Sequence, residues 1–195
     1  MFVSHSRERL LNAIVYFVSN TKYCNTIKLF KLLNFLDFEH YRQTGKSVTN
    51  LRYEAWPQGP VPKELWDEIH KPANDFQKKI TVSVARDELT DVPARRDFII
   101  NSRFDQKYFT KRELEIMQML IFYFAELTAD QMSKYSHSRN MPWHKIYNVQ
   151  GKKSGTIPYE LTFESDSIIK NMPTIEKEEF EYRREALSEI NANTK

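Results

Sequence analysis

Apolar residues recur every three or four positions near the start of the chain, and this spacing predicts two amphipathic helices. The first covers 8–18. The second covers 26–44, where Asn25 or Thr26 can cap its start and Gly45 can end it in a left-handed conformation. Apolar side chains occupy more than half of the second helix's circumference, so it must be packed on several sides. They leave a narrow polar strip, whose charged side chains are expected to face water: Lys28, Lys31, Glu39 and Arg42.

Two capping boxes predict the starts of two later helices. Thr110 precedes Glu113 by three residues, and Thr128 precedes Gln131 by the same spacing. In each box the hydroxyl and the later side chain can both accept hydrogen bonds from backbone N–H groups at the helix start. The predicted helices cover 111–126 and 129–137. The first is apolar nearly all round in its second half, so we place it at the centre of the core beside 26–44.

Alternating apolar and polar residues predict short strands between these helices. The segments 51–56, 80–85 and 97–102 form a small antiparallel sheet in this interpretation, with 159–163 as a fourth and weaker strand, and 86–96 reads as a charged loop. A helix over 62–70 should start at Pro62 and turn Leu65, Trp66 and Ile69 inward. The predicted fold class is therefore α+β, a mainly α-helical domain with two long buried helices and a small antiparallel sheet.

Length and composition favour one globular domain. The chain has 195 residues, of which 41% are hydrophobic and 13% aromatic, enough to bury a sizeable core. We expect the domain to occupy 1–165. The remaining segment, 166–195, is charge-rich with sparse apolar residues, and we expect it to form a peripheral helix that frays at its end.

Charge and cysteine content narrow the class of protein. The formal charge of +3, from 29 Lys and Arg against 26 Asp and Glu, neither implies nor excludes nucleic acid as a partner. Cys24 is the only cysteine, which suits a reducing compartment, and the N-terminus lacks the pattern of a secretory signal. The most apolar stretch, 116–125, is far shorter than the roughly 20 residues of a membrane-spanning helix. We therefore expect a cytoplasmic protein without a membrane partner.

The sequence contains only weak signals for catalytic or metal-binding residues. The five histidines do not form an H-x-x-x-H pair, and His137 and His144 lie seven residues apart around a proline. Asp37 and His40 share a helix face but lack an accompanying nucleophile. The basic segment GKKSGT at 151–156 lacks the spacing of a phosphate-binding P-loop. We therefore expect no catalytic, metal or cofactor site; a hydrolase that uses His137 or His144 is the weakest alternative.

Two loops with tryptophan and proline stand out as candidate binding elements. In AWPQGPVP the prolines restrict the backbone before binding, and Trp56 offers a large contact area at a small cost in side-chain entropy. A second proline–tryptophan pair, Pro142-Trp143, follows SHSRNM. These are properties of interface hot spots. The alternative, that all three tryptophans turn inward and seal the core, stays open at this point.

The order of these motifs resembles the SocA-like Panacea domain of bacteria and their phages. The resemblance covers roughly 8–150. Its motifs are the Lys- and Leu-rich helix, a Thr-Gly, an aromatic residue before Gly-Pro-Val, an acidic residue before a Phe-Thr helix start, a Thr-headed helix, and Ser-His followed by Pro-Trp. In this chain they are Lys31-Leu32-Leu33, Thr44-Gly45, Trp56, Gly59-Pro60-Val61, Asp105, Phe109-Thr110, Thr128, Ser136-His137 and Pro142-Trp143.

The resemblance implies an antitoxin, a protein that neutralises a co-encoded toxin by direct binding or by presenting it to a cellular protease. On this hypothesis the two tryptophan loops form or support the toxin-binding surface. A transcriptional regulator that binds DNA is the main alternative, motivated by Arg95, Arg96 and the basic loop. The oligomeric state stays open. The candidate partner-binding residues are Trp56, Gln58, Gly59, Pro60, Val61, Trp66, His137, Pro142 and Trp143.

Overall fold

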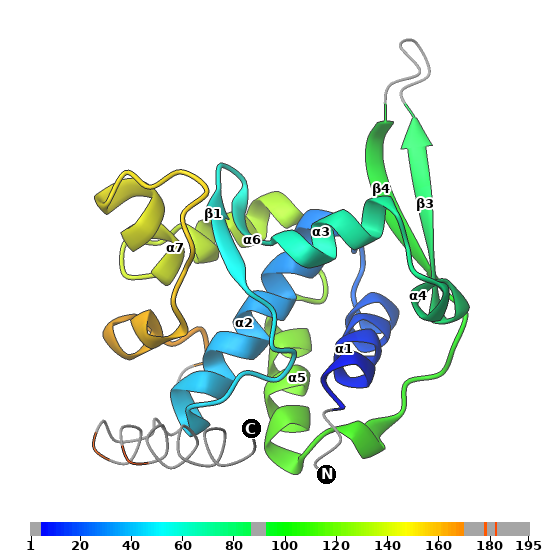
Figure 1. Cartoon of the computed structure of the whole chain (residues 1–195), viewed down its shortest axis with the longest axis horizontal. Coiled ribbons are helices and arrows are strands. Elements are labelled where there is room, and N and C mark those ends of the chain that lie inside the picture. Colours follow the sequence, from blue (N-terminus) through cyan, green and yellow to red (C-terminus); the bar gives the residue numbers. More distant parts are fainter. Residues whose placement is uncertain (1–4, 87–92, 170–177, 179–181, 183–195) are drawn as a thin grey trace, which may run out of the picture.

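The fold is described from a computed structural model, which describes residues 5–86, 93–169, 178 and 182. It is an α+β arrangement of helices with two small antiparallel sheets (Figure 1). The elements in chain order are α1 (Ser6–Asn20), α2 (Thr26–Thr44), β1 (Tyr53–Trp56), β2 (Gly59–Pro62), α3 (Lys63–His70), α4 (Asn74–Lys79), β3 (Ile80–Arg86), β4 (Pro93–Ile100), η1 (Gln106–Tyr108), α5 (Lys111–Phe124), α6 (Ala129–Ser136), α7 (Pro142–His144), η2 (Lys145–Val149) and η3 (Tyr159–Glu164).

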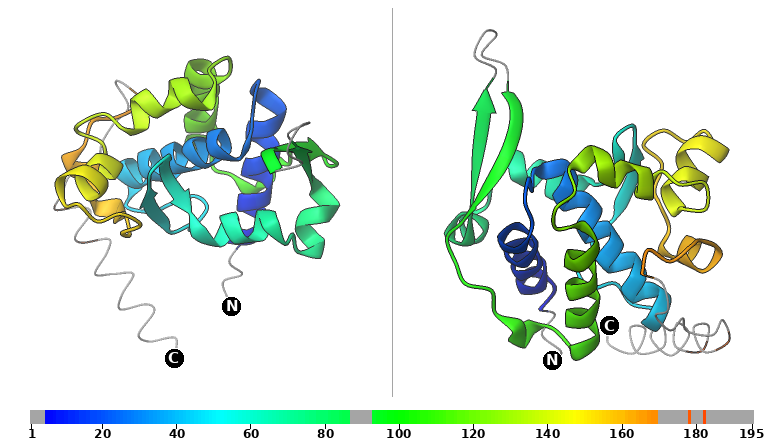
Figure 2. Two further views of the ribbon diagram at one scale, coloured as in Figure 1. Left: turned by 90° about the horizontal axis from the view of Figure 1, so that it is seen from above. Right: turned by 180° about the vertical axis from the view of Figure 1, so that it is seen from behind.

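Helix α2 runs through the middle of the molecule, and the other elements pack around it. It contacts α1, α5 and α6, the strand β2, and the short helix η3 (Figures 1 and 2). Both of its predicted ends are confirmed. The Asn25 side chain accepts a hydrogen bond from the backbone N–H of Lys28, and Gly45 has a φ of 70°. The helix that the sequence predicted to be packed on several sides is therefore the one around which the core is built.

The polar strip of α2 is buried, which contradicts the expectation that it faces water. Lys28, Lys31, Glu39 and Arg42 are all less than 10% exposed. The physical reason is that connecting segments lie over the strip and present backbone groups to it. The Lys28 ammonium, for instance, donates to the carbonyl of Lys22 in the α1–α2 connection and to those of Ala125 and Leu127 in the α5–α6 connection.

Asp37 lies on the same helix and is fully buried. Its carboxylate accepts hydrogen bonds from the backbone N–H groups of Val48 and Thr49, both at 2.8 Å, and from the hydroxyls of Thr49 and Tyr53. Glu39 in turn accepts from the N–H of Ile168 at 2.8 Å. Buried polar groups require such partners, so these carboxylates attach the segments that follow α2 and η3 to the central helix.

Both capping boxes are confirmed by their geometry. The Thr110 hydroxyl accepts from the Glu113 N–H, and the Glu113 carboxylate accepts from the Thr110 N–H at 2.6 Å; Thr128 and Gln131 repeat the arrangement. The end of α5 differs from the prediction that it is buried all round. Phe122 is 79% exposed and Tyr123 is 42% exposed, because only one face of the helix packs on the core.

The strands differ from the single sheet that the sequence predicted. They form two separate two-stranded sheets, β1–β2 and β3–β4, and 159–164 is a short 3₁₀ helix. The unpredicted strand is β2, whose sequence GPVP contains two prolines. Because Pro60 and Pro62 are two residues apart, their missing N–H groups face the same side of the strand, and Gly59 and Val61 can still pair with β1.

The pairing of 80–85 with 97–102 is confirmed by the β3–β4 hairpin, which projects from the helices (Figure 1). The predicted loop 86–96 is too long, because β4 already begins at Pro93. The predicted helix over 62–70 is α3, with Leu65 and Ile69 buried and Trp66 half-buried. Most of the predicted tail, 166–195, lies outside the described residues, so its structure and the domain boundary at 165 stay predictions.

Candidate functional site

The two tryptophan loops, which are far apart in sequence, lie against each other. The indole N–H of Trp143 donates to the backbone carbonyl of Trp56 at 2.8 Å. Trp143 lies in α7, directly after Pro142 at the first position of that helix, and Trp56 ends β1. The pair therefore joins the β1–β2 hairpin to the segment that follows α6, as the sequence hypothesis of one shared surface requires.

Neighbouring aromatic rings extend from this contact in both directions. The rings of His137 and Tyr147 stack with Trp143, with centroids 3.9 Å and 4.6 Å away. On the hairpin side, the Trp56 ring lies 5.4 Å from the Trp66 ring of α3. Tyr147, on η2, is a member of this cluster that the sequence analysis did not identify. Its position after Trp143 at a spacing of four residues is the signal that could have found it.

The predicted site residues divide by burial into two groups. Gln58 is exposed, and Trp56, Trp66 and His137 are half-buried, as is Tyr147. We call the exposed parts of these five side chains the tryptophan surface. The other candidates are buried and lie beneath it, where they can hold the surface in place: Gly59, Pro60, Val61, Pro142 and Trp143. The alternative in which every tryptophan seals the core therefore holds for Trp143 and not for Trp56 or Trp66.

Gly59 begins β2 and lies beside His137, the residue that follows α6, and Lys31 of α2. Its φ of 124° is one that residues with a side chain rarely adopt. A Cβ atom here would also lie 3.4 Å from both His137 Nε2 and Lys31 Cε. Glycine is therefore required by the backbone conformation of the turn, whereas a Cβ atom would meet the two side chains at an ordinary contact distance.

Lys31 is the charged residue that the sequence analysis placed in water, and it lies beneath this turn. Its ammonium donates to the Gln58 carbonyl at 2.9 Å. Burial lowers the pKa of Lys31 to about 8. The pKa of His137 is also lowered, by burial and by the charge of Lys31, so the imidazole is neutral at pH 7. The turn thus rests on one cation that no carboxylate contacts among the described residues.

Replacing Lys31 with methionine is expected to remove a pH dependence of stability. The pKa of Lys31 in the folded protein lies below the usual 10.5. Its protonation-dependent contribution to the free energy of unfolding is therefore full above pH 10.5 and is lost as the pH falls through about 8. Between pH 8 and pH 10 the free energy of unfolding of wild-type protein should therefore rise by on the order of 1–3 kcal/mol relative to that of Lys31→Met. Urea unfolding at several pH values measures this difference. The exposed-lysine control Lys46→Met should follow wild type, and an equal slope in all three proteins would contradict the assignment.

Catalytic and metal chemistry have few candidate groups at this site. Among the residues that the structure describes, no three His, Cys, Asp or Glu side chains are grouped so that they could hold a metal ion. His144, the other histidine of the hydrolase alternative, is half-buried on α7. No helix within the described ranges is long and apolar enough to cross a membrane. The arrangement therefore consists of a supported, partly exposed aromatic surface, which suits binding.

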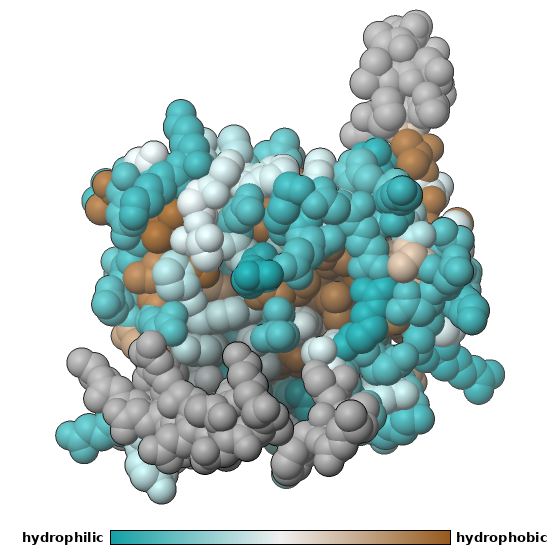
Figure 3. Space-filling model, viewed as in Figure 1, coloured by the Kyte–Doolittle hydropathy of each residue, from teal (hydrophilic) through white to brown (hydrophobic). Residues whose placement is uncertain are grey.

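Around this surface the face shown in Figure 3 is mostly hydrophilic, with apolar side chains visible in its depressions. The basic loop 151–156 lies against the hairpin rather than standing free. Ala55 donates to the Gly155 carbonyl at 2.8 Å, and Ser154 donates to the Ala55 carbonyl at 2.8 Å. The loop therefore fixes the outer edge of β1, close to the tryptophan surface.

Comparison with known proteins identifies one family. The model of the family described as "Antitoxin SocA-like, Panacea domain" matches residues 29–144, more than half of the chain. The match begins within α2 and ends with α7, so it includes both tryptophan loops. Neither a curated protein nor a solved structure matches the chain.

Proposed function

The chain belongs to the SocA-like antitoxins that carry a Panacea domain, and on this premise we propose that it neutralises a protein toxin by binding it directly through the tryptophan surface. Family membership supports an antitoxin-type role and, in general terms, a toxin as partner, and it favours a non-enzymatic role. Which surface meets the toxin, and whether the contact blocks the toxin or presents it to a protease, belong to the proposal.

The observation that carries the choice of surface is the bond between the Trp143 indole and the Trp56 carbonyl. It joins two loops separated by 87 residues, so the half-buried rings above it are held in one arrangement before any partner arrives. A rigid aromatic surface loses little conformational entropy on binding, and tryptophan is enriched among the residues that dominate binding energy. Such a surface can cover the part of a toxin that acts on its target.

The proposal is tested by co-expression with the product of the reading frame that adjoins this gene. We expect growth to be rescued and a stable complex to be purified. Trp56→Ala should weaken the complex about tenfold or more, measured by calorimetry, because a half-buried hot-spot ring is lost while the supporting Trp143 stays. A circular dichroism melt must first show that the variant folds.

A matched aromatic control separates this surface from another one. Phe122→Ala removes a ring that is 79% exposed at the end of α5. We expect this variant to bind the toxin as wild type does. If Phe122→Ala abolishes the complex while Trp56→Ala does not, the toxin binds at the α5 end and the assignment of the surface is wrong. If wild-type protein neither rescues growth nor forms a complex, the proposed function itself fails.

A further inference from the structure

A pocket of about 250 Å³ opens beside the tryptophan surface. It lies where the N-terminus of α2 meets the β1–β2 turn, α3 and β4, and its lining includes Thr26, Gln58, Trp66, Arg95 and Arg96. Gln58 and Trp66 also belong to the tryptophan surface, so the two sites are continuous. The volume suits roughly one side chain of a partner rather than a whole small-molecule ligand.

The electrostatics of the pocket favour an anion. No acidic side chain is among its lining residues. The Arg95 guanidinium is engaged with Asp97 at 2.8 Å, whereas Arg96 is half-buried and has no carboxylate partner in the described part of the chain. An isolated bridge between Asn25 and Asp97 holds β4 beside the start of α2, whose positive dipole end adds to the field of the arginines.

Thr26 supplies a second and independent indication of a ligand. The residue is only 7% exposed, and its hydroxyl has no hydrogen-bond partner among the described residues. The neighbouring Asn25 side chain is already occupied by the Lys28 N–H, so it does not satisfy this hydroxyl. A buried hydroxyl without a partner costs stability. The hydroxyl is covered in the free protein, so a rotation of the Thr26 side chain toward an acceptor in the pocket would bring the two together and remove that cost.

We propose that this pocket binds the carboxylate of an aspartate or glutamate side chain on the protein that occupies the tryptophan surface. Arg96 would donate charge-assisted hydrogen bonds to the carboxylate, Thr26 would donate a further one, and the Trp66 ring would contact an apolar neighbour of the acidic residue. The inference rests on the proposed function, since it names the chemistry of the same partner.

A protein carboxylate fits these observations better than nucleic acid does. Binding a phosphate backbone requires cations spaced along a stripe, and affinity then grows with the number of phosphates contacted. Here two arginines and an aromatic side chain line one half-open pocket. The total formal charge of +3 also gives little long-range attraction for a polyanion.

Two synthetic peptides test the pocket without requiring the toxin. Acetyl-Gly-Glu-Phe-Gly-amide is titrated into ¹⁵N-labelled full-length protein, beside the same peptide with Gln in place of Glu. We expect the Glu peptide to shift the amide signals of Thr26 and Arg96 and the indole signal of Trp66, with about tenfold higher affinity than the Gln peptide. Equal binding of both, or no shift up to about 10 mM peptide, overturns the proposal.

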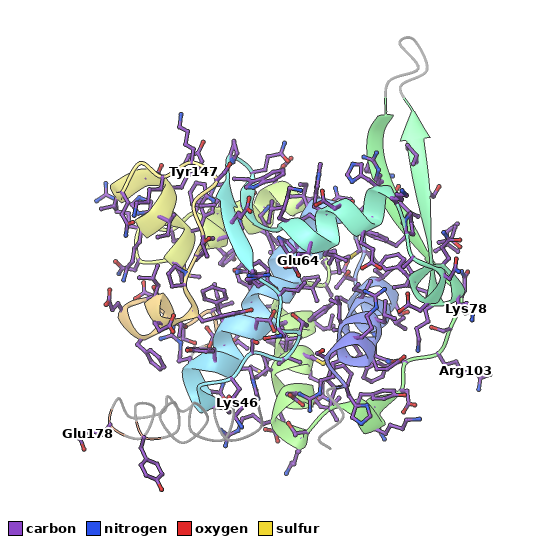
Figure 4. All side chains as sticks on the ribbon, viewed as in Figure 1. Lys46, Glu64, Lys78, Arg103, Tyr147 and Glu178 are labelled. Atoms are coloured by element: carbon purple, nitrogen blue, oxygen red, sulfur yellow. The ribbon has the colours of Figure 1, made fainter. Side chains whose placement is uncertain are left out.

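Three variants locate the contact. Arg96→Gln should weaken binding of the Glu peptide about tenfold, because its charge-assisted bonds are lost. Thr26→Val should weaken it by a few-fold without lowering the melting temperature, since it removes a hydroxyl that is unpaired in the free protein. Arg103→Gln is the charge-matched control, because Arg103 is exposed, does not line the pocket, and points outward on the segment between β4 and α5 (Figure 4). Equal losses in Arg96→Gln and Arg103→Gln would overturn the proposal.

The remaining outcomes separate the two proposals. A DNA duplex of about 20 base pairs that shifts the same three signals more strongly than the Glu peptide would replace the carboxylate with a phosphate backbone. If the toxin is bound and neutralised but the peptides do not bind, the pocket inference fails and the proposed function stands. If the Glu peptide binds as expected but no toxin is neutralised, the proposed function fails and the pocket remains a carboxylate site.

Discussion

Asp37→Ala is expected to lower the free energy of unfolding by about 3–5 kcal/mol, one of the two largest effects that we expect of a single substitution in this protein. The variant removes the acceptor for two backbone N–H groups and two hydroxyls, and leaves these buried donors without partners. Thermal and urea unfolding measure the loss. Because Val48 and Thr49 lose their attachment to α2, the segment after Gly45 should also exchange its amide hydrogens faster.

The control for this prediction is Asp67→Ala on α3. Asp67 is 59% exposed and pairs with Lys63, so its loss should cost less than about 1 kcal/mol.

Burial raises the pKa of Asp37 from 3.8 to about 6. The part of its contribution to stability that depends on protonation is therefore full below pH 3.8 and is lost as the pH rises through about 6. Asp37→Asn should lack this decline, and similar losses for Asp37→Ala and Asp67→Ala would contradict the structural role.

Trp143→Ala is expected to lower the free energy of unfolding by about 3–5 kcal/mol and to abolish toxin binding as well. The side chain is 5% exposed and stacks with His137 and Tyr147. Its removal leaves a cavity and releases the Trp56 carbonyl, so the β1–β2 hairpin would no longer be fixed to α7. Urea unfolding and calorimetry with the co-purified toxin measure the two effects.

Trp143→Phe distinguishes the ring from its hydrogen bond. Phenylalanine keeps a ring that can stack and removes the indole N–H, so the loss should be smaller, on the order of 1–2 kcal/mol. Tyr135→Ala, which removes a ring that is 47% exposed on α6, serves as the aromatic control and should stay within about 1 kcal/mol of wild type. If Trp143→Ala behaves like Tyr135→Ala, Trp143 does not hold the surface together.

Local signals in the sequence were sufficient wherever neighbouring residues determine the structure. Both capping boxes form as predicted, because Thr110 with Glu113 and Thr128 with Gln131 satisfy each other's backbone groups within one turn. The left-handed end of α2 at Gly45 is equally local. The GPVP strand was missed because its prolines oppose strand formation in general, and only pairing with β1 on one side makes them acceptable.

The candidate site was predicted in part. Its residues were chosen correctly as neighbours, since the Trp56 loop and the Trp143 loop meet, but their burial was not predictable. A tryptophan in a proline-rich loop can face solvent or core, and the choice depends on what packs against it from distant segments. Such packing also places Tyr147, Lys31 and Arg96 at or beside the site. Lys31 had been expected to face water.

By itself the sequence determined the apolar central helix, the caps, the main helices, the pairing within the β3–β4 hairpin, and the motifs by which the family is identified. Only the tertiary structure decided that the polar strip of α2 is internal, and that two tryptophan loops and an arginine-lined pocket adjoin one another. The physical reason is how far apart the interacting groups lie along the sequence. Helix ends and periodic faces depend on groups within a few residues, whereas the burial of Lys31 or Asp37 depends on backbone groups supplied by segments that are distant in sequence or outside the helix.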